Sequence, residues 1–139
     1  DVAEDVSEPT PSALRTAYTE ALRSTVAAVG PETVAADSEV EADRIEALAG
    51  GESPTLTVEE AAAVLAVDPD QPDAEAIVFE LRDHLLMGMT TGVLDVDTIA
   101  ATVDVDLTGQ EIQQAIEGRT AMTLDQLAAI QSVIDSRRA

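Results

Sequence analysis

An acidic segment in the second half of the chain has the spacing of the opening of a calcium-binding loop. Residues 104–109 read DVDLTG, with aspartates at the first and third positions. The twelfth position of such a loop supplies a bidentate carboxylate, and here it is Ala115. We therefore interpret the segment as a turn in which Asp104 and Asp106 cap helices, and we expect no metal site.

The chain has one histidine, His84, and no cysteine. A histidine performs acid–base or nucleophilic chemistry with a second group arranged beside it, and the sequence indicates none for His84. We interpret it as a residue at the surface or at the boundary of its helix. The lack of cysteine excludes disulfides, thiolate nucleophiles and cysteine-ligated metals. We expect no catalytic residue, no cofactor and no enzyme activity.

Acidic residues dominate the charge of the chain. It has 28 aspartates and glutamates against seven basic residues, all of them arginine, and a formal net charge of −21. A hydrophobic content of 45% distinguishes it from acidic disordered chains. Such a surface is typical of proteins adapted to molar salt, where charge repulsion is screened within roughly 3 Å. We therefore expect a halophilic protein. We also expect it to be cytoplasmic, because no apolar run indicates a membrane span and no signal peptide indicates export.

Helix start and stop signals predict an all-α fold. Thr57 with Glu60, and Thr123 with Gln126, have the spacing of capping boxes, and no segment alternates with the period of a strand. Residues 1–10 are acidic, lack an apolar stripe and are predicted to be a flexible arm. The predicted helices cover residues 11–29, 31–36, 40–49, 57–67, 73–93, 95–102, 108–117 and 123–136.

Aliphatic side chains must build most of the core, because Tyr18 and Phe79 are the only aromatic residues. Residues 85–89, LLMGM, are compatible with a soft partner-binding surface or with the core, and we favour the core. The side chains that we expect to be buried are Ile45, Leu48, Val64, Ile112, Ile116 and Leu127.

The two halves of the chain share one pattern. TVAA at 33–36 matches TIAA at 98–101, and TVEEA at 57–61 matches TLDQL at 123–127. A long predicted helix precedes the pattern in each half. The sequence therefore predicts a duplication, with one repeat at 11–67 and a second at 73–136, packed as one compact unit.

Each repeat resembles the lambda-repressor-like (Cro/CI-type) helix-turn-helix domain. In that family a long helix precedes a short helix with a buried alanine, and a third helix ends in isoleucine, an aliphatic residue and glycine. The repeats read TVAADSEVEADRIEALAGGESPTLTVEEAAAVL and TIAATVDVDLTGQEIQQAIEGRTAMTLDQLAAI. The resemblance covers residues 11–135 and implies two four-helix units. The whole chain also resembles a family of uncharacterised haloarchaeal proteins, which implies no activity.

This resemblance also implies candidate contact residues. The family reads DNA bases from the N-terminal part of the third helix, and glutamine can pair with adenine edges. In the first repeat the matching residues 41–44, EADR, include two carboxylates that would repel phosphate. In the second repeat the candidates for contact with DNA or with a protein partner are Thr108, Gln110, Gln113, Gln114 and Arg119.

Two functions are compatible with these features. The first is a non-enzymatic regulatory or scaffolding module whose repeats bind a protein partner or a second copy of the chain. The second is a DNA-binding transcriptional regulator that acts through the second repeat. We favour the first, because the charge of −21 and the lack of lysine oppose phosphate binding. We expect no membrane contact and no small-molecule substrate.

We predict that the fold depends on salt. Lowering KCl from several molar to about 0.1 M extends the screening length to roughly 10 Å, so that carboxylate repulsion should open the chain. Far-UV circular dichroism along this series should show loss of helix. Full helicity and a cooperative melt in dilute buffer would contradict the prediction.

Overall fold

The computed structural model describes residues 10–138, so that the predicted arm, apart from Thr10, lies outside the described residues. Within this part the chain forms helices and no strand, which confirms the all-α prediction. None of these helices combines the length and apolarity needed to cross a bilayer. The eight described helices are α1 (Pro11–Val29), α2 (Pro31–Ser38), α3 (Ala42–Ala49), α4 (Val58–Leu65), α5 (Ala74–Gly92), α6 (Val96–Thr102), α7 (Gly109–Ile116) and α8 (Leu124–Arg138).

Side-chain caps fix where most of these helices begin. Thr57 accepts a hydrogen bond from the Glu60 backbone N–H, and Glu60 accepts one from the backbone N–H of Thr57, which closes the predicted capping box of α4. Thr123 and Gln126 form the same box at α8. Thr108 and Glu111 form a third, at α7, that was not predicted.

The expectation that Asp104 and Asp106 cap helices is wrong. The N-cap of α6 is Asp95, and the N-cap of α7 is Thr108. A threonine that forms a capping box with Glu111 satisfies the first backbone N–H groups of α7, so that no aspartate is needed there. The two aspartates lie exposed in the α6–α7 connection.

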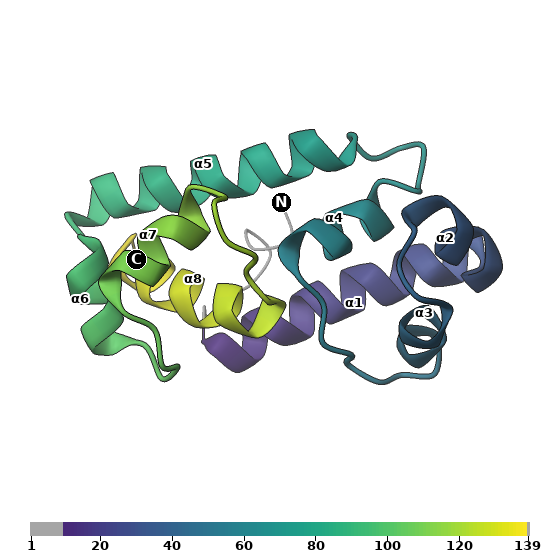
Figure 1. Cartoon of the computed structure of the whole chain (residues 1–139), viewed down its shortest axis with the longest axis horizontal. Coiled ribbons are helices and arrows are strands. Elements are labelled where there is room, and N and C mark those ends of the chain that lie inside the picture. The colour runs from purple at the N-terminus through teal and green to yellow at the C-terminus, as the bar shows by residue number, and fades with distance from the viewer. Residues whose placement is uncertain (1–9, 139) are drawn as a thin grey trace.

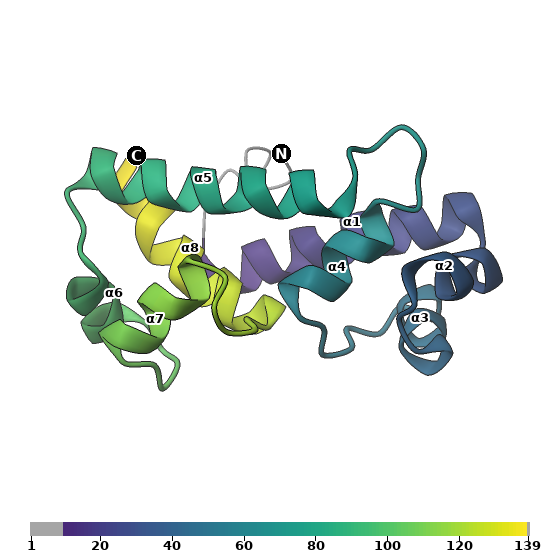
Figure 2. The same ribbon diagram turned by 45° about the horizontal axis from the view of Figure 1, so that its top comes forward.

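The two long helices, α1 and α5, frame the molecule, with α4 and α8 between them (Figure 1). The last helix of each half packs against the long helix of the other half: α8 on α1, and α4 on α5. The short pairs α2–α3 and α6–α7 lie at opposite ends, which both views show (Figures 1 and 2). The halves therefore share one body, and the order of their helices is the same. The duplication itself stays a prediction.

The backbone segments that lead into α4 and α8 are joined directly. The Val58 N–H donates to the Met122 carbonyl at 2.8 Å, and the Leu124 N–H donates to the Leu56 carbonyl at 2.9 Å. Thr57 and Thr123, the caps of the two helices, face each other in this antiparallel bridge. The two halves are thus hydrogen-bonded to each other at corresponding positions.

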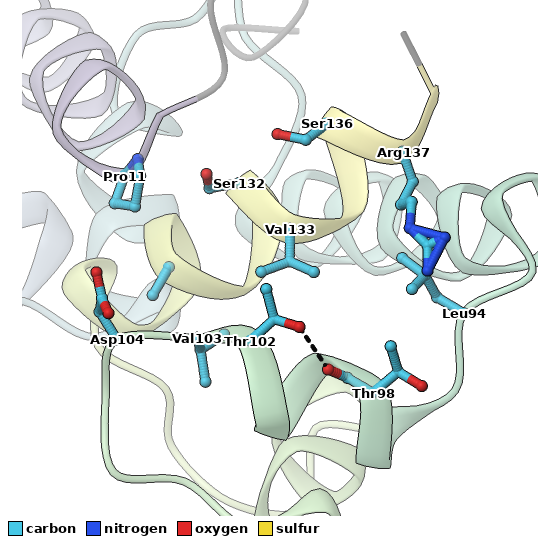
Figure 3. Close-up of a pocket in the computed structure, with 11 residues that line it drawn as sticks. Pro11, Leu94, Thr98, Thr102, Val103, Asp104, Ser132, Val133, Ser136 and Arg137 are labelled. Atoms are coloured by element: carbon cyan, nitrogen blue, oxygen red, sulfur yellow. Dashed lines mark hydrogen bonds between the residues drawn. The ribbon is translucent and has the colours of Figure 1, made fainter.

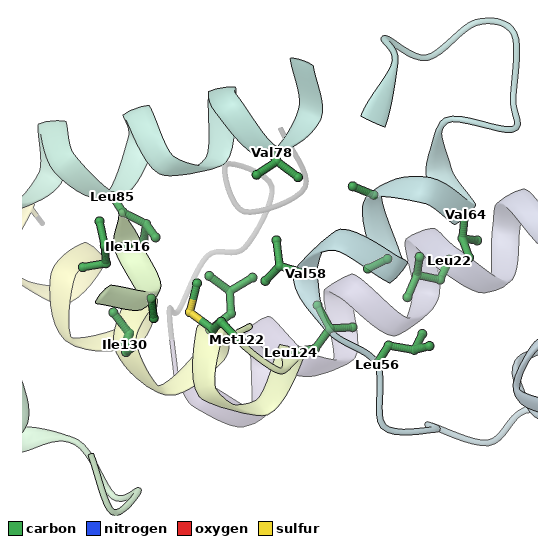
Figure 4. Close-up of a cluster of buried hydrophobic side chains, with 14 of the residues drawn as sticks. Leu22, Leu56, Val58, Val64, Val78, Leu85, Ile116, Met122, Leu124 and Ile130 are labelled. Carbon is green, nitrogen blue, oxygen red and sulfur yellow. The ribbon is translucent and has the colours of Figure 1, made fainter. Parts of the chain in front are cut away.

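One large apolar core runs through both halves (Figure 4), and a second, small cluster joins Leu14 to Ala128. The six side chains predicted to be buried are all buried. In the 85–89 segment, Leu85 is fully buried, but Leu86 and Met87 are exposed, so that the preference for the core is wrong for these two residues. Because each residue turns the helix by roughly 100°, the side chains of Leu86 and Met87 point away from that of Leu85. Helical periodicity identified the apolar residues of this segment but did not show which of them are buried.

Replacing Leu85 with alanine should lower the free energy of unfolding by about 2–5 kcal/mol, because it leaves a cavity in the shared core. The matched control is Met87→Ala on the exposed side of α5, which should change the free energy by less than about 0.5 kcal/mol. Chemical denaturation in molar KCl measures both. Equal effects of the two substitutions would contradict the packing described for α5.

Candidate functional site

The residues proposed from the helix-turn-helix resemblance do not form one surface. Gln110 and Gln113 are exposed on α7, one turn apart. Gln114 is half-buried and lines a small cavity with Leu107 and Met122. Gln110 and Gln113 are therefore the two of these three glutamines whose side chains are exposed to a partner.

The other two candidates in the second half already have partners within the chain. The Thr108 hydroxyl accepts a hydrogen bond from the Glu111 N–H at 3.1 Å as the cap of α7. Arg119 lies beyond the end of α7, and its guanidinium is 2.5 Å from a carboxylate oxygen of Glu117. A phosphate would have to compete with Glu117 for Arg119.

In the first half, the arginine of the corresponding helix, α3, is held more tightly. The Arg44 guanidinium donates to both carboxylate oxygens of Glu60, at 2.9 and 2.5 Å. This bidentate pair, with a further contribution from the Thr57 N–H, lowers the pKa of the Glu60 carboxyl. Asp43 and Glu46 are exposed on the same helix. The outer face of α3 is therefore negatively charged.

Three further arginines hold the body of the protein together. Arg15 on α1 donates to Asp125 of α8 at 2.9 Å and to the carbonyl of Pro54. Arg82 on α5 lies 3.6 Å from a carboxylate oxygen of Glu59, and its guanidinium lies against Gly118, where an added Cβ would displace it. Arg23 donates to the carbonyls of Leu48 and Glu52 and to the carboxylate of Glu20.

Exposed apolar residues are concentrated on one helix. Among the described residues, the large hydrophobic side chains that are exposed all lie on α5 or at its end: Phe79 (70%), Leu86 (50%), Met87 (59%) and Val93 (88%). Phe79 and Leu86 are two turns apart and share a face of α5. We call these four residues the α5 apolar face. Such concentrated exposure is typical of an interaction surface.

A groove adjoins the α5 apolar face, between α5, α6 and α7. It has a volume of about 320 Å³. Met89, Val96 and Ile116 provide its apolar lining. Leu86 lies on its α5 side and Gln113 on its α7 side, so that one candidate contact residue belongs to the same surface as the α5 apolar face. We call this space the α5–α7 groove.

A chain of polar side chains crosses the centre of the protein and was not predicted. The Tyr18 hydroxyl on α1 donates to the Gln131 side-chain carbonyl on α8, and the Gln131 amide donates to Asp135 at 3.1 Å. The second oxygen of Asp135 is 3.0 Å from Nε2 of His84 on α5. His84 is thus a partly buried residue with partners, which corrects the expectation that no second group lies beside it.

This polar chain acts as a structural connection. Gln131 is fully buried, and burial raises the pKa of the Tyr18 phenol above its ordinary value. Each group in the chain satisfies its neighbour, and together they join α1, α8 and α5. The available sequence signal was Gln131 itself, a polar residue within the apolar stripe formed by Leu127, Ile130 and Ile134.

A second cavity, of about 340 Å³, lies between α6, α8 and the start of α1 (Figure 3). Hydroxyl groups and aliphatic side chains line it. Thr102 donates its hydroxyl hydrogen to the Thr98 carbonyl, and the side chains of Ser132, Ser136 and Arg137 point in different directions. A site for a small molecule places a few polar groups so that they converge on the ligand, which this cavity does not do.

The comparisons with known proteins give a family and no activity. A model of a family of unknown function, DUF5791, matches residues 14–137. No curated protein and no solved structure matches the chain.

We predict that Tyr18 and Gln131 contribute to stability as a pair. Gln131→Leu removes the acceptor of the buried Tyr18 hydroxyl and should cost about 1–3 kcal/mol. In the Gln131→Leu variant, Tyr18→Phe should lower the free energy of unfolding by less than it does in the native chain, because it removes the hydroxyl that has lost its acceptor. Denaturation of the two single variants and the double variant measures the coupling. Additive effects would contradict the connection.

Proposed function

This chain belongs to the DUF5791 family of unknown function, and we propose that it is a non-enzymatic regulatory or scaffolding module that binds a protein. The observation that carries this proposal is the α5 apolar face: the exposed large hydrophobic side chains of the described residues lie together on one helix. The chain has 28 acidic residues, which are the usual type on its surface. Four exposed apolar residues in one segment therefore favour a partner that covers them.

The positions of the arginines support a protein partner over DNA. Non-specific affinity for DNA comes from cations that contact phosphates. The five arginines at positions 15, 23, 44, 82 and 119 each pair with a carboxylate within the chain. Freeing Arg15, Arg44 or Arg82 would also cost contacts that join helices. These arginines should therefore contribute little affinity for DNA phosphates.

The polar chain of Tyr18, Gln131, Asp135 and His84 supports a non-enzymatic role. It is the one arrangement of the described residues that resembles a catalytic relay, yet its groups satisfy one another between packed helices. A general acid or base must reach a proton of the substrate, and the side chains of His84 and Asp135 are each only 14% exposed. We further propose that the acidic surface adapts the chain to molar salt.

DNA binding through the second half is the other candidate. The exposed amides of Gln110 and Gln113 on α7 favour it, because their spacing fits two neighbouring base edges. Direct readout by amides depends less on phosphate attraction than binding by arginines does.

The test recovers the tagged protein from its source cells at their own salt concentration, after crosslinking and with or without nuclease. We expect one or more proteins to be retained after nuclease treatment, with no enriched DNA sequence. Gln113→Ala should leave nucleic acid recovery unchanged.

The opposite result would support DNA readout instead. Sharp sequence-specific DNA peaks that are lost in the Gln113→Ala variant would overturn the proposed function. A good bidentate amide contact is worth about 1–3 kcal/mol, which is large enough to remove such peaks. The control is Gln114→Ala, since Gln114 is half-buried beside the α7–α8 connection, whereas Gln110 and Gln113 are exposed.

A further inference from the structure

We propose that the α5 apolar face and the adjoining α5–α7 groove bind one amphipathic helix of a partner protein, with apolar residues on one side and arginine or lysine beside them. This inference rests on the proposed function and specifies its surface and its class of partner. It is carried by a difference between the two long helices, by the shape of the groove and by the charges around it.

At four aligned positions, α5 has a large apolar residue where α1 has a polar residue or glycine. α1 and α5 have the same length, 19 residues, and align on their buried leucines, Leu22 and Leu85. In this alignment, polar residues or glycine on α1 stand where α5 has large apolar residues. The pairs are Thr16 and Phe79, Arg23 and Leu86, Ser24 and Met87, and Gly30 and Val93.

The exchange of Arg23 for Leu86 also opens the groove. In the first half, the Arg23 guanidinium extends from α1 to the C-terminal end of α3 and donates to the carbonyl of Leu48 at 3.0 Å. In the second half, Leu86 makes no such bridge to α7 and instead lines the α5–α7 groove with Gln113. The side chain that ties the long helix to the third helix in one half is thus replaced by an exposed apolar side chain in the other.

Valine at position 93, at the end of α5, is less favourable for the fold than glycine would be. Its φ is 53°, in the left-handed region where a β-branched residue is strained and glycine is favoured. The corresponding residue of α1 is Gly30, also at positive φ. An exposed valine that contributes little to the fold is explained if a partner covers it.

The charges around this surface select the partner. Glu75 and Asp83 are exposed one turn on either side of Phe79, and Asp95 is exposed where α6 begins beside the groove. Apolar residues flanked by carboxylates complement a helix with apolar anchors and cationic neighbours. From Phe79 to Val93 the surface extends about 21 Å, which accommodates roughly four turns of a partner helix. A second copy of this acidic chain lacks that complementarity.

The experiment uses the full chain in molar KCl and a displayed library of random peptides, long enough for about five helical turns. Selected peptides are synthesised and their affinities measured for the native chain and three variants. Leu86→Gln and Met87→Gln change the proposed surface. Ser24→Gln is the matched control, at the position of α1 that corresponds to Met87. Sedimentation of each variant follows self-association.

We expect selected peptides with apolar residues at helical spacing and cationic neighbours. Leu86→Gln and Met87→Gln should weaken them about 10–100-fold, and Ser24→Gln should not. The inference is overturned if no peptide is selected, if the α5 variants bind as the native chain does, or if Leu86→Gln dissolves a dimer. A cellular protein partner that still binds Leu86→Gln would overturn this surface alone, whereas specific DNA recovery would overturn the proposed function.

Discussion

The antiparallel bridge between the segments before α4 and α8 determines how the rest of the protein is arranged. Two backbone hydrogen bonds, from Val58 to Met122 and from Leu124 to Leu56, fix the starts of these two helices against each other. From that point α4 and α8 each pack against both long helices, α1 and α5. The central pair lies between the two long helices (Figure 1), and Phe79, Leu86 and Met87 of α5 are exposed. The exposed side of α5 is one consequence.

The chain has few cationic residues, and several of its arginines connect one helix to another. Arg15 connects α1 to α8, and Arg82 connects α5 to α4 and lies beside the glycine after α7. Each exposed or partly exposed pair contributes modestly by itself. Their common effect is to draw carboxylates of one element toward another element, against the repulsion that the net charge creates. The acidic surface and the internal arginines are two parts of the same electrostatic arrangement.

Local signals in the sequence predicted the helices well, because caps and breaks act within a few residues. The boxes at Thr57 and Thr123 are examples. Contacts between distant segments were not predictable in this way: Tyr18 meets Gln131 only once α1 and α8 pack together. For the same reason, periodicity identified the apolar residues of α5 but could not show which of them α8 and α4 would cover. The side of α5 that bears Met87 was therefore misassigned.

The bridge between the halves also has a meaning in terms of symmetry. Its two hydrogen bonds exchange places under a two-fold rotation that relates Thr57 to Thr123, as the contacts of an isologous dimer do. In a dimer of identical chains, every substitution appears on both sides of the axis. A single chain with two halves is free of that constraint, so that Arg23 can close one end of the molecule while Leu86 leaves the other end open. Because both halves lie in one chain, a residue on one side of the bridge can differ from the residue at the corresponding position on the other side.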